Sequence, residues 1–182
     1  MSLEIEQQVK LLQEQLNQLQ SKQAKDQISI IVFSGDLDKV LAAMIIATGA
    51  RAMDMEVKMF FTFWGTAMLR DKNKPVNGKD FMSKMFGFML PKGSTQLKLS
   101  KLNMGGMGTT MLKGLMKKKR VASLEEMVTT AAELGVEINI CEMSMDLMGF
   151  KKSEMIDYPH LKYCGVGTYL SDADESRVQL FI

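Results

Sequence analysis

The strongest constraint on the fold is a run of β-branched and other apolar residues at positions 28–33. A run that is apolar on both faces is typical of a central strand in a parallel sheet. Residues 34–36 form a short turn, and Asp36 is the expected cap of a following helix whose apolar residues recur at helical spacing. A second apolar run at 57–64 ends at Gly65, and the helix between the runs has the length of a right-handed crossover. The sequence therefore predicts an α/β fold.

Three further strands are predicted downstream. Residues 136–141 alternate apolar and polar side chains, and shorter apolar runs follow at 161–164 and 178–182. Ser123 and Glu126 have the spacing of a capping box, which indicates that a helix begins there. Five strands interleaved with helices predict a three-layer α/β/α domain with a five-stranded, mainly parallel sheet.

Residues 1–26 are predicted to form a separate amphipathic helix in front of an α/β domain at 27–182. Polar residues surround one narrow apolar stripe with the four-and-three spacing of a coiled coil, and Asp26 and Gln27 are expected to end the helix. A helix of this kind needs a partner surface, so we expect a homo-oligomer. The alternative is that the helix lies on its own domain or is a linker. The stripe consists of Ile5, Val9, Leu12, Leu16 and Leu19.

Residues 71–120 interrupt the alternation of strands and helices as a helical, methionine-rich insertion. One helix is expected at 79–90 and a second after the glycines near position 106, and each carries three methionines on one face. Such faces suit a partner groove or a subunit interface, and the lysines around them suit an anionic membrane surface. Copper binding is less favoured, and core filler is the remaining alternative. The two triads are Met82, Met85, Met89 and Met104, Met107, Met111.

The two cysteines are the candidate reactive residues. Cys141 lies at the end of a predicted strand and at the start of a helix, where unpaired N–H groups favour the nucleophilic thiolate. The alternative for Cys141 is a buried structural cysteine. Cys164 occupies the same setting in the next strand. Because the carboxyl ends of parallel strands share one edge, we expect the two thiols within reach of each other.

The same edge is expected to form the substrate cleft. Its walls would be the residues that end the other strands, with Trp64 either in the core or over the cleft. The single histidine, His160, lies beside a proline and is expected on the surface rather than as a catalytic base. The predicted cleft residues are Ser34, Gly35, Trp64, Gly65 and Gly165.

The strand at 136–141, which ends in Asn139-Ile140-Cys141, resembles the sulfur-accepting cysteine loop of the DsrE/DsrF/DsrH-like family. The likeness extends over most of residues 28–182 and is closest to the DsrE2-type branch. It implies a small α/β protein that holds sulfane sulfur on Cys141 as a persulfide or thiosulfonate. It also implies a rhodanese-type sulfur donor, a thiol acceptor protein and self-assembly, with no metal and no organic cofactor.

Composition narrows the class of function. The net charge of +2 does not indicate a nucleic-acid-binding protein. Two cysteines without a CxxC pair argue against a zinc site or disulfide scaffold and fit a reducing compartment. We find no pattern of a signal peptide or membrane span, so a cytoplasmic location is expected.

The function expected from these observations is a cytoplasmic sulfur carrier or sulfurtransferase. The alternative is a non-catalytic assembly or membrane-surface module. Peroxide reduction and dithiol redox chemistry are less favoured, because the sequence motifs typical of them are missing.

Overall fold

The computed structural model describes residues 2–21, 24–74 and 81–182. Its strands are β1 (Lys25–Val32), β2 (Glu56–Phe61), β3 (Glu137–Cys141), β4 (Leu161–Cys164) and β5 (Ser176–Phe181). Its α-helices are α1 (Ser2–Ser21), α2 (Leu37–Ala52), α3 (Phe81–Met89), α4 (Met107–Lys119), α5 (Leu124–Glu133), α6 (Glu142–Met148) and α7 (Val166–Glu175). Short 3-10 turns are η1 (Phe63–Leu69), η2 (Ser94–Gln96), η3 (Met104–Gly106) and η4 (Lys152–Glu154).

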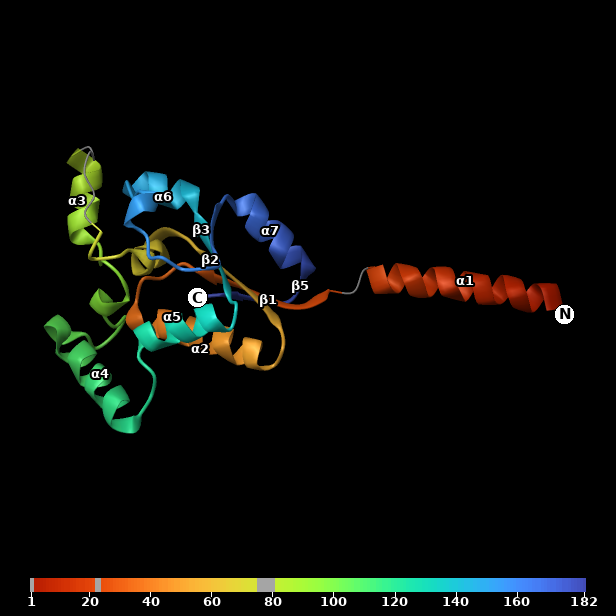
Figure 1. The fold of residues 1–182 in the computed structure, drawn as a ribbon, viewed down its shortest axis with the longest axis horizontal. Helices are drawn as coiled ribbons and strands as arrows, with labels where there is room; N and C mark the ends of the chain where they lie inside the picture. Colours follow the sequence, from red (N-terminus) through yellow and green to blue (C-terminus); the bar gives the residue numbers. More distant parts are fainter. Residues whose placement is uncertain (1, 22–23, 75–80) are drawn as a thin grey trace.

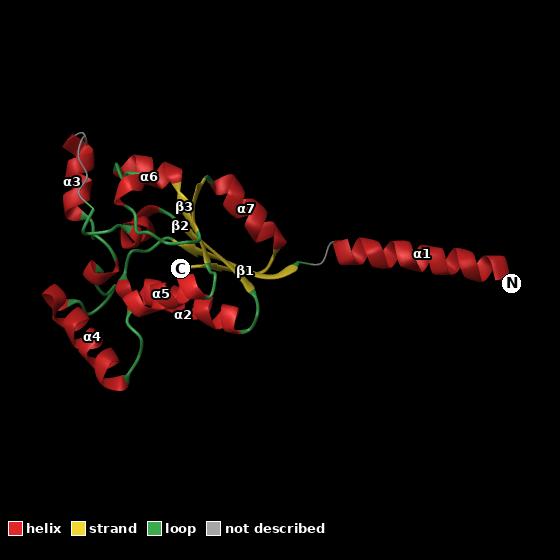
Figure 2. Ribbon diagram, in the orientation of Figure 1, coloured by secondary structure: helices red, strands yellow, loops and turns green. Residues whose placement is uncertain are grey.

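The five strands form one sheet in the order β4-β3-β2-β1-β5, and all neighbouring pairs are parallel. Helices α2 and α5 lie side by side on one side of the sheet, whereas α6 and α7 lie on the other (Figure 1). Figure 2 shows the strands enclosed between these helices. The predicted three-layer α/β/α fold with a parallel five-stranded sheet is confirmed.

The two faces of the sheet differ chemically. Toward α2 and α5, alternate strand residues such as Ile30, Met59 and Ile138 are fully buried and form the hydrophobic core. The side chains that alternate with them point toward α7, and most of those on β1, β3 and β4 are polar. The residues of β1 to β4 that point to this second face include Gln27, Ser29, Lys58, Glu137, Asn139, Cys141, Lys162 and Cys164.

Helix α7 crosses this polar face and satisfies much of it. The ring of Tyr169 lies 5.3 Å from that of Phe60, and Asp172 Oδ1 pairs with Lys58 Nζ at 2.5 Å. At the amino end of β1, Ser176 Oγ is 2.7 Å from both Gln27 Nε2 and Ser29 Oγ. Buried polar groups need such partners. The expectation that residues 28–33 are apolar on both faces was therefore wrong at Ser29.

Several predicted boundaries shift in the structure. Helix α1 ends at Ser21, and Asp26 and Gln27 belong to β1, because Gln27 is buried and hydrogen-bonded to α7. Strand β2 ends at Phe61, so Trp64 lies in η1 and is 45% exposed rather than in the core. The predicted helix at 79–90 is described from Phe81 as α3, and residues 79–80 lie outside the described residues. The capping box of Ser123 and Glu126 is confirmed.

The methionine-rich insertion contains α3 and α4, which stand at the end of the molecule opposite to α1 (Figure 1). Met85, Met89, Met104, Met107 and Met111 are all exposed, so core filler was the wrong alternative for them. The side chains of Met82, Leu16 and Leu19 lie outside the described residues. Ile5, Val9 and Leu12 on α1 are exposed, and self-association through this stripe stays a prediction.

Arg70 joins the insertion to the domain. Its buried guanidinium pairs with Glu154 at 3.1 Å and lies 4.5 Å from the centre of the Phe150 ring. It also donates to three backbone carbonyls at and beyond the end of α3, those of Gly87, Leu90 and Pro91. A cation at this position satisfies carbonyls that a helix end leaves without partners.

We expect Arg70→Met to lower the free energy of unfolding by about 3–5 kcal/mol, because it removes the cation paired with the buried Glu154 carboxylate and the donor to three backbone carbonyls. Urea unfolding followed by circular dichroism measures the change. Lys25→Met is the matched control, because its ion pair with Glu175 is exposed and should matter far less. If Arg70→Met were as stable as wild type, Arg70 would not join the insertion to the domain in the way described above.

Candidate functional site

The two cysteines are direct neighbours at the carboxyl edge of the sheet. Strands β3 and β4 end at Cys141 and Cys164, and these two residues are paired in the parallel register. Paired residues of neighbouring strands are ~4.8 Å apart and point to the same face. Neither cysteine is in a disulfide. The structure therefore brings the two predicted residues together.

Their surroundings are unequal. Cys141 is 2% exposed and occupies the N-cap position of α6, which a hydrogen bond between Thr62 and Ser144 ties to the end of β2. Cys164 is half-buried. Burial raises the pKa of the Cys164 thiol, a hydrogen bond with Thr168 acts in the opposite direction, and the nearby Asp172 carboxylate adds to the rise. Cys164 is thus held mainly as the thiol at neutral pH.

A row of polar side chains continues from the cysteines along the same face. Asn139 Nδ2 donates to Glu137 Oε1 at 3.1 Å, and Lys162 pairs with the other oxygen of Glu137. Burial raises the pKa of Glu137, but the hydrogen bonds from Lys162 and Asn139 outweigh it, so the pKa lies below its usual value. Asn139 Oδ1 is buried without a hydrogen-bond partner in the described part of the chain.

Three of the five predicted cleft residues gather elsewhere on this edge. Ser34, Gly35 and Trp64 line a cavity of about 750 Å³ together with residues at the end of α3, but neither cysteine lines it. Gly35 and Gly65 let the loops after β1 and β2 approach closely, since a Cβ would lie 2.7 Å from Trp64 O and 2.3 Å from Val32 O respectively. Gly165 is exposed and caps α7 beside Cys164.

His160 is exposed and precedes β4, where its carbonyl accepts from the N–H of Ile138. This is the amino edge of the sheet, whereas the cysteines are at the carboxyl edge. Within the described residues, no three His, Cys, Asp or Glu side chains are grouped as a metal ion would require.

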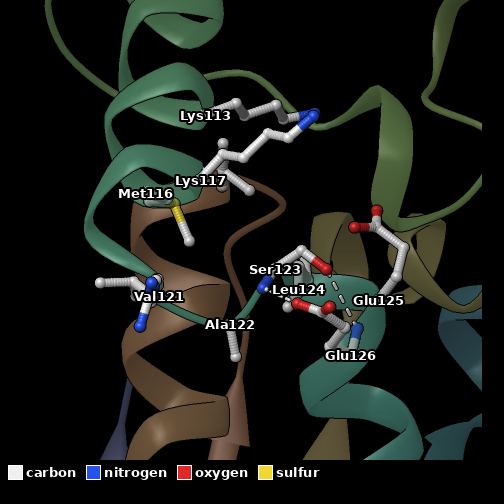
Figure 3. A pocket seen from close by; sticks show the side chains of 11 residues that line it. Lys113, Met116, Lys117, Val121, Ala122, Ser123, Leu124, Glu125 and Glu126 are labelled. Atoms are coloured by element: carbon white, nitrogen blue, oxygen red, sulfur yellow. Dashed lines mark hydrogen bonds between the residues drawn. The ribbon is translucent and has the colours of Figure 1, made fainter.

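Another cavity, of about 620 Å³, lies between α4 and the start of α5, and neither cysteine lines it. Figure 3 shows Lys113 and Lys117 extending from α4 on one side, with Glu125 and the hydrogen-bonded pair of Ser123 and Glu126 on the other. Because its walls carry both charges, the cavity does not indicate a ligand of one sign.

Sequence reasoning found the cysteines because both strands end visibly in the pattern. It did not find that Asn139 is buried, although alternation placed it on the same face as Cys141. The polar positions of β3 are visible in the sequence. The same alternation, however, occurs in a strand whose polar side faces water and in a strand whose polar side is covered by a helix.

Comparisons with known proteins found a matching family model and similar proteins. Residues 24–181 match the model of the DsrE/DsrF/DrsH-like family. The chain is 47% identical to YrkE of Bacillus subtilis over 154 residues, which cover 85% of this chain and 95% of YrkE. It is 36% identical to the sulfur carrier protein DsrE2 of Allochromatium vinosum over 158 residues, which cover 85% of this chain and 97% of that protein.

Among solved structures, the YchN protein of E. coli is similar over 86% of this chain and 98% of its own, with 12% sequence identity and a TM-score of 0.48. The family match extends from the start of β1 into the end of β5, so it includes both cysteines and the whole sheet. The chain belongs to the DsrE/DsrF/DrsH-like family.

Proposed function

We propose that this protein is a sulfur carrier that holds sulfane sulfur on Cys141 and passes it to a thiol of a partner protein. The observation that carries the proposal is the in-register pair of Cys141 and Cys164 at the carboxyl edge of the sheet. The 36% identity to a protein named as a sulfur carrier supports it. A reducing compartment such as the cytoplasm would keep both thiols free.

The transfer is a pair of thiol exchange steps. The thiolate of Cys141 attacks the outer sulfur of a donor persulfide, a new S–S bond forms, and the donor leaves as a thiolate. An acceptor thiolate then attacks the outer sulfur of the Cys141 persulfide and releases Cys141. Atoms and electrons balance without an external oxidant. A rhodanese-type persulfide has the chemistry of the donor.

We expect the two thiols to play different parts in the transfer. Burial raises the pKa of the Cys164 thiol and so disfavours the nucleophilic thiolate there, and we therefore give the first attack to Cys141. Cys164 lies beside the adduct and is half-exposed, which suits it to take over the outer sulfur on the way to a partner. Because Cys141 is 2% exposed, its cover must move before a donor can reach it, and the same burial shields a bound sulfur from small thiols.

We expect intact-protein mass spectrometry to detect added sulfur on the wild type and on Cys164→Ser after incubation with polysulfide. Cys141→Ser should remain unmodified or gain much less, because it lacks the acceptor. The double variant is the control for sulfur bound elsewhere. An adduct that persists on Cys141→Ser and disappears on Cys164→Ser would place the acceptor on Cys164 and contradict the assignment.

In Cys141→Ser, the rate at which iodoacetamide alkylates Cys164 should rise with pH around a midpoint above that of a cysteine peptide. Burial favours the neutral thiol, so the pH must rise further before the reactive thiolate forms. The same variant unfolded in urea is the control, and its midpoint should return to the peptide value. A native midpoint at or below the peptide value would show that the surroundings of Cys164 favour the thiolate.

A second candidate function is an interaction module, and the charge distribution favours it. Residues 71–120 carry twelve Lys and Arg against two Asp, whereas the rest of the chain carries eleven against nineteen Asp and Glu. On α3 and α4, the exposed apolar side chains Phe81, Phe88, Met107 and Met111 lie among these cations. We infer that this surface contacts an anionic membrane. None of the described helices is both long and apolar enough to cross one.

We expect the protein to sediment with phosphatidylglycerol vesicles at low salt but not with phosphatidylcholine vesicles. Met111→Glu should weaken this binding several-fold, because it places a carboxylate on the contact surface. Leu147→Glu on α6 is the matched control, since Leu147 is 64% exposed but lies outside the basic segment. Equal binding to both lipids, or none, would contradict the membrane contact.

A further inference from the structure

Asn139 has a buried polar atom for which the structure shows no partner. The residue is 2% exposed, and its Oδ1 accepts no hydrogen bond from any described residue. Buried polar side-chain atoms in folded proteins nearly always have a partner, and an exception needs an explanation. The position of Asn139 in the fold supplies one.

The orientation of the Asn139 carboxamide is fixed by its neighbours. Lys162 Nζ lies 2.5 Å from Glu137 Oε2, and this charge keeps Glu137 ionised. An ionised carboxylate only accepts hydrogen bonds, so Asn139 must present Nδ2 to Glu137, as the distance of 3.1 Å shows. Oδ1 is then on the other branch of the carboxamide and points away from Glu137.

Away from Glu137, the next side chain on the same face of β3 is that of Cys141. Residues two apart in a strand share a face and are separated by about 6.6 Å. That gap is long for a hydrogen bond from the thiol itself. A sulfur atom bonded to Cys141 Sγ extends the side chain by about 2 Å and can reach toward Oδ1.

The side chains paired with Asn139 on the two neighbouring strands add no hydrogen-bond acceptor. On β2, Asn139 is paired with Phe60, whose ring packs against Tyr169 of α7. On β4, it is paired with Lys162, which donates to Glu137. Asn139 Oδ1 is thus an oriented hydrogen-bond acceptor that lies beside apolar rings and the ion pair of Glu137 with Lys162.

We propose that Asn139 Oδ1 accepts a hydrogen bond from the terminal S–H of a persulfide on Cys141. This inference rests on the proposed carrier function and adds a binding residue for the outer sulfur. A single acceptor stabilises the protonated persulfide over its anion. In the protonated form the outer sulfur is the electrophile. An acceptor thiolate therefore forms the new S–S bond at this sulfur, the old bond breaks, Cys141 leaves as a thiolate, and the proton stays on the transferred sulfur.

The test compares the lifetime of the adduct in wild type and Asn139→Leu. Both are loaded with polysulfide, freed of excess reagent, and followed by intact mass in dithiothreitol. Asn139→Leu should load but lose its sulfur about fivefold more slowly, because without the acceptor more of the persulfide is the anion, whose outer sulfur is a poor electrophile, and one neutral hydrogen bond shifts that balance by about this factor. The near-ultraviolet band of the ionised persulfide should also appear at lower pH in this variant. If Asn139→Leu does not fold, Asn139→Val, which suits a strand, replaces it.

Two further variants separate this role from a structural one. Gln27→Met removes a buried amide whose Oε1 also lacks a partner among the described residues, but at the amino end of β1, so the adduct should decay as in wild type. In Glu137→Gln, the new amide can donate as well as accept, so the carboxamide of Asn139 can adopt either orientation. The adduct should then decay at a rate between those of wild type and Asn139→Leu.

Equal decay and equal ionisation of wild-type and Asn139→Leu adducts would overturn the role of Asn139 and leave the carrier function intact. A change as large in Gln27→Met would overturn it as well. A wild-type protein that takes up no sulfur would overturn the carrier function, and this inference with it.

Discussion

The structure depends on a parallel sheet whose two faces are chemically different. One face is apolar and packs against α2 and α5, and its burial drives folding. The other face is polar, and α7 covers it by hydrogen bonds and the ion pair of Lys58 with Asp172 rather than by apolar packing alone. Buried polar groups must be satisfied, so this face specifies the path of α7 across the sheet. It also provides a covered, polar environment at the edge where β3 and β4 end.

The cysteines inherit their properties from that arrangement. Because β3 and β4 are parallel and in register, Cys141 and Cys164 are placed side by side by the backbone, independent of side-chain choices around them. Cys141 is enclosed and Cys164 is half-exposed at the start of α7. A bound sulfur on Cys141 would be protected from solvent and yet lie beside a second thiol. The cavity lined by Ser34, Gly35 and Trp64 is a separate feature of the same edge.

The sequence was sufficient for the fold because strand cores and helix caps leave local patterns. The runs around Ile30, Met59 and Ile138, and the capping box at Ser123, identify their elements directly. The ends of β3 and β4 also predicted that the two cysteines meet. Alternation, however, does not tell whether a polar strand residue faces water or a covering helix, so the burial of Asn139 was not foreseen. Trp64 was misplaced for a related reason: its apolar run continues past the last paired residue of β2, and only the sheet register shows where pairing stops.

The most direct test of the sulfur site is a crystal structure of the protein after polysulfide treatment. The expected result is additional density for sulfur on Cys141 Sγ, with the outer atom turned toward Asn139 Oδ1 and α7 in place over the polar face. Additional sulfur on Cys164 alone, or unmodified cysteines with a water molecule bound to Asn139 Oδ1, would contradict both the acceptor assignment and the role of the polar face.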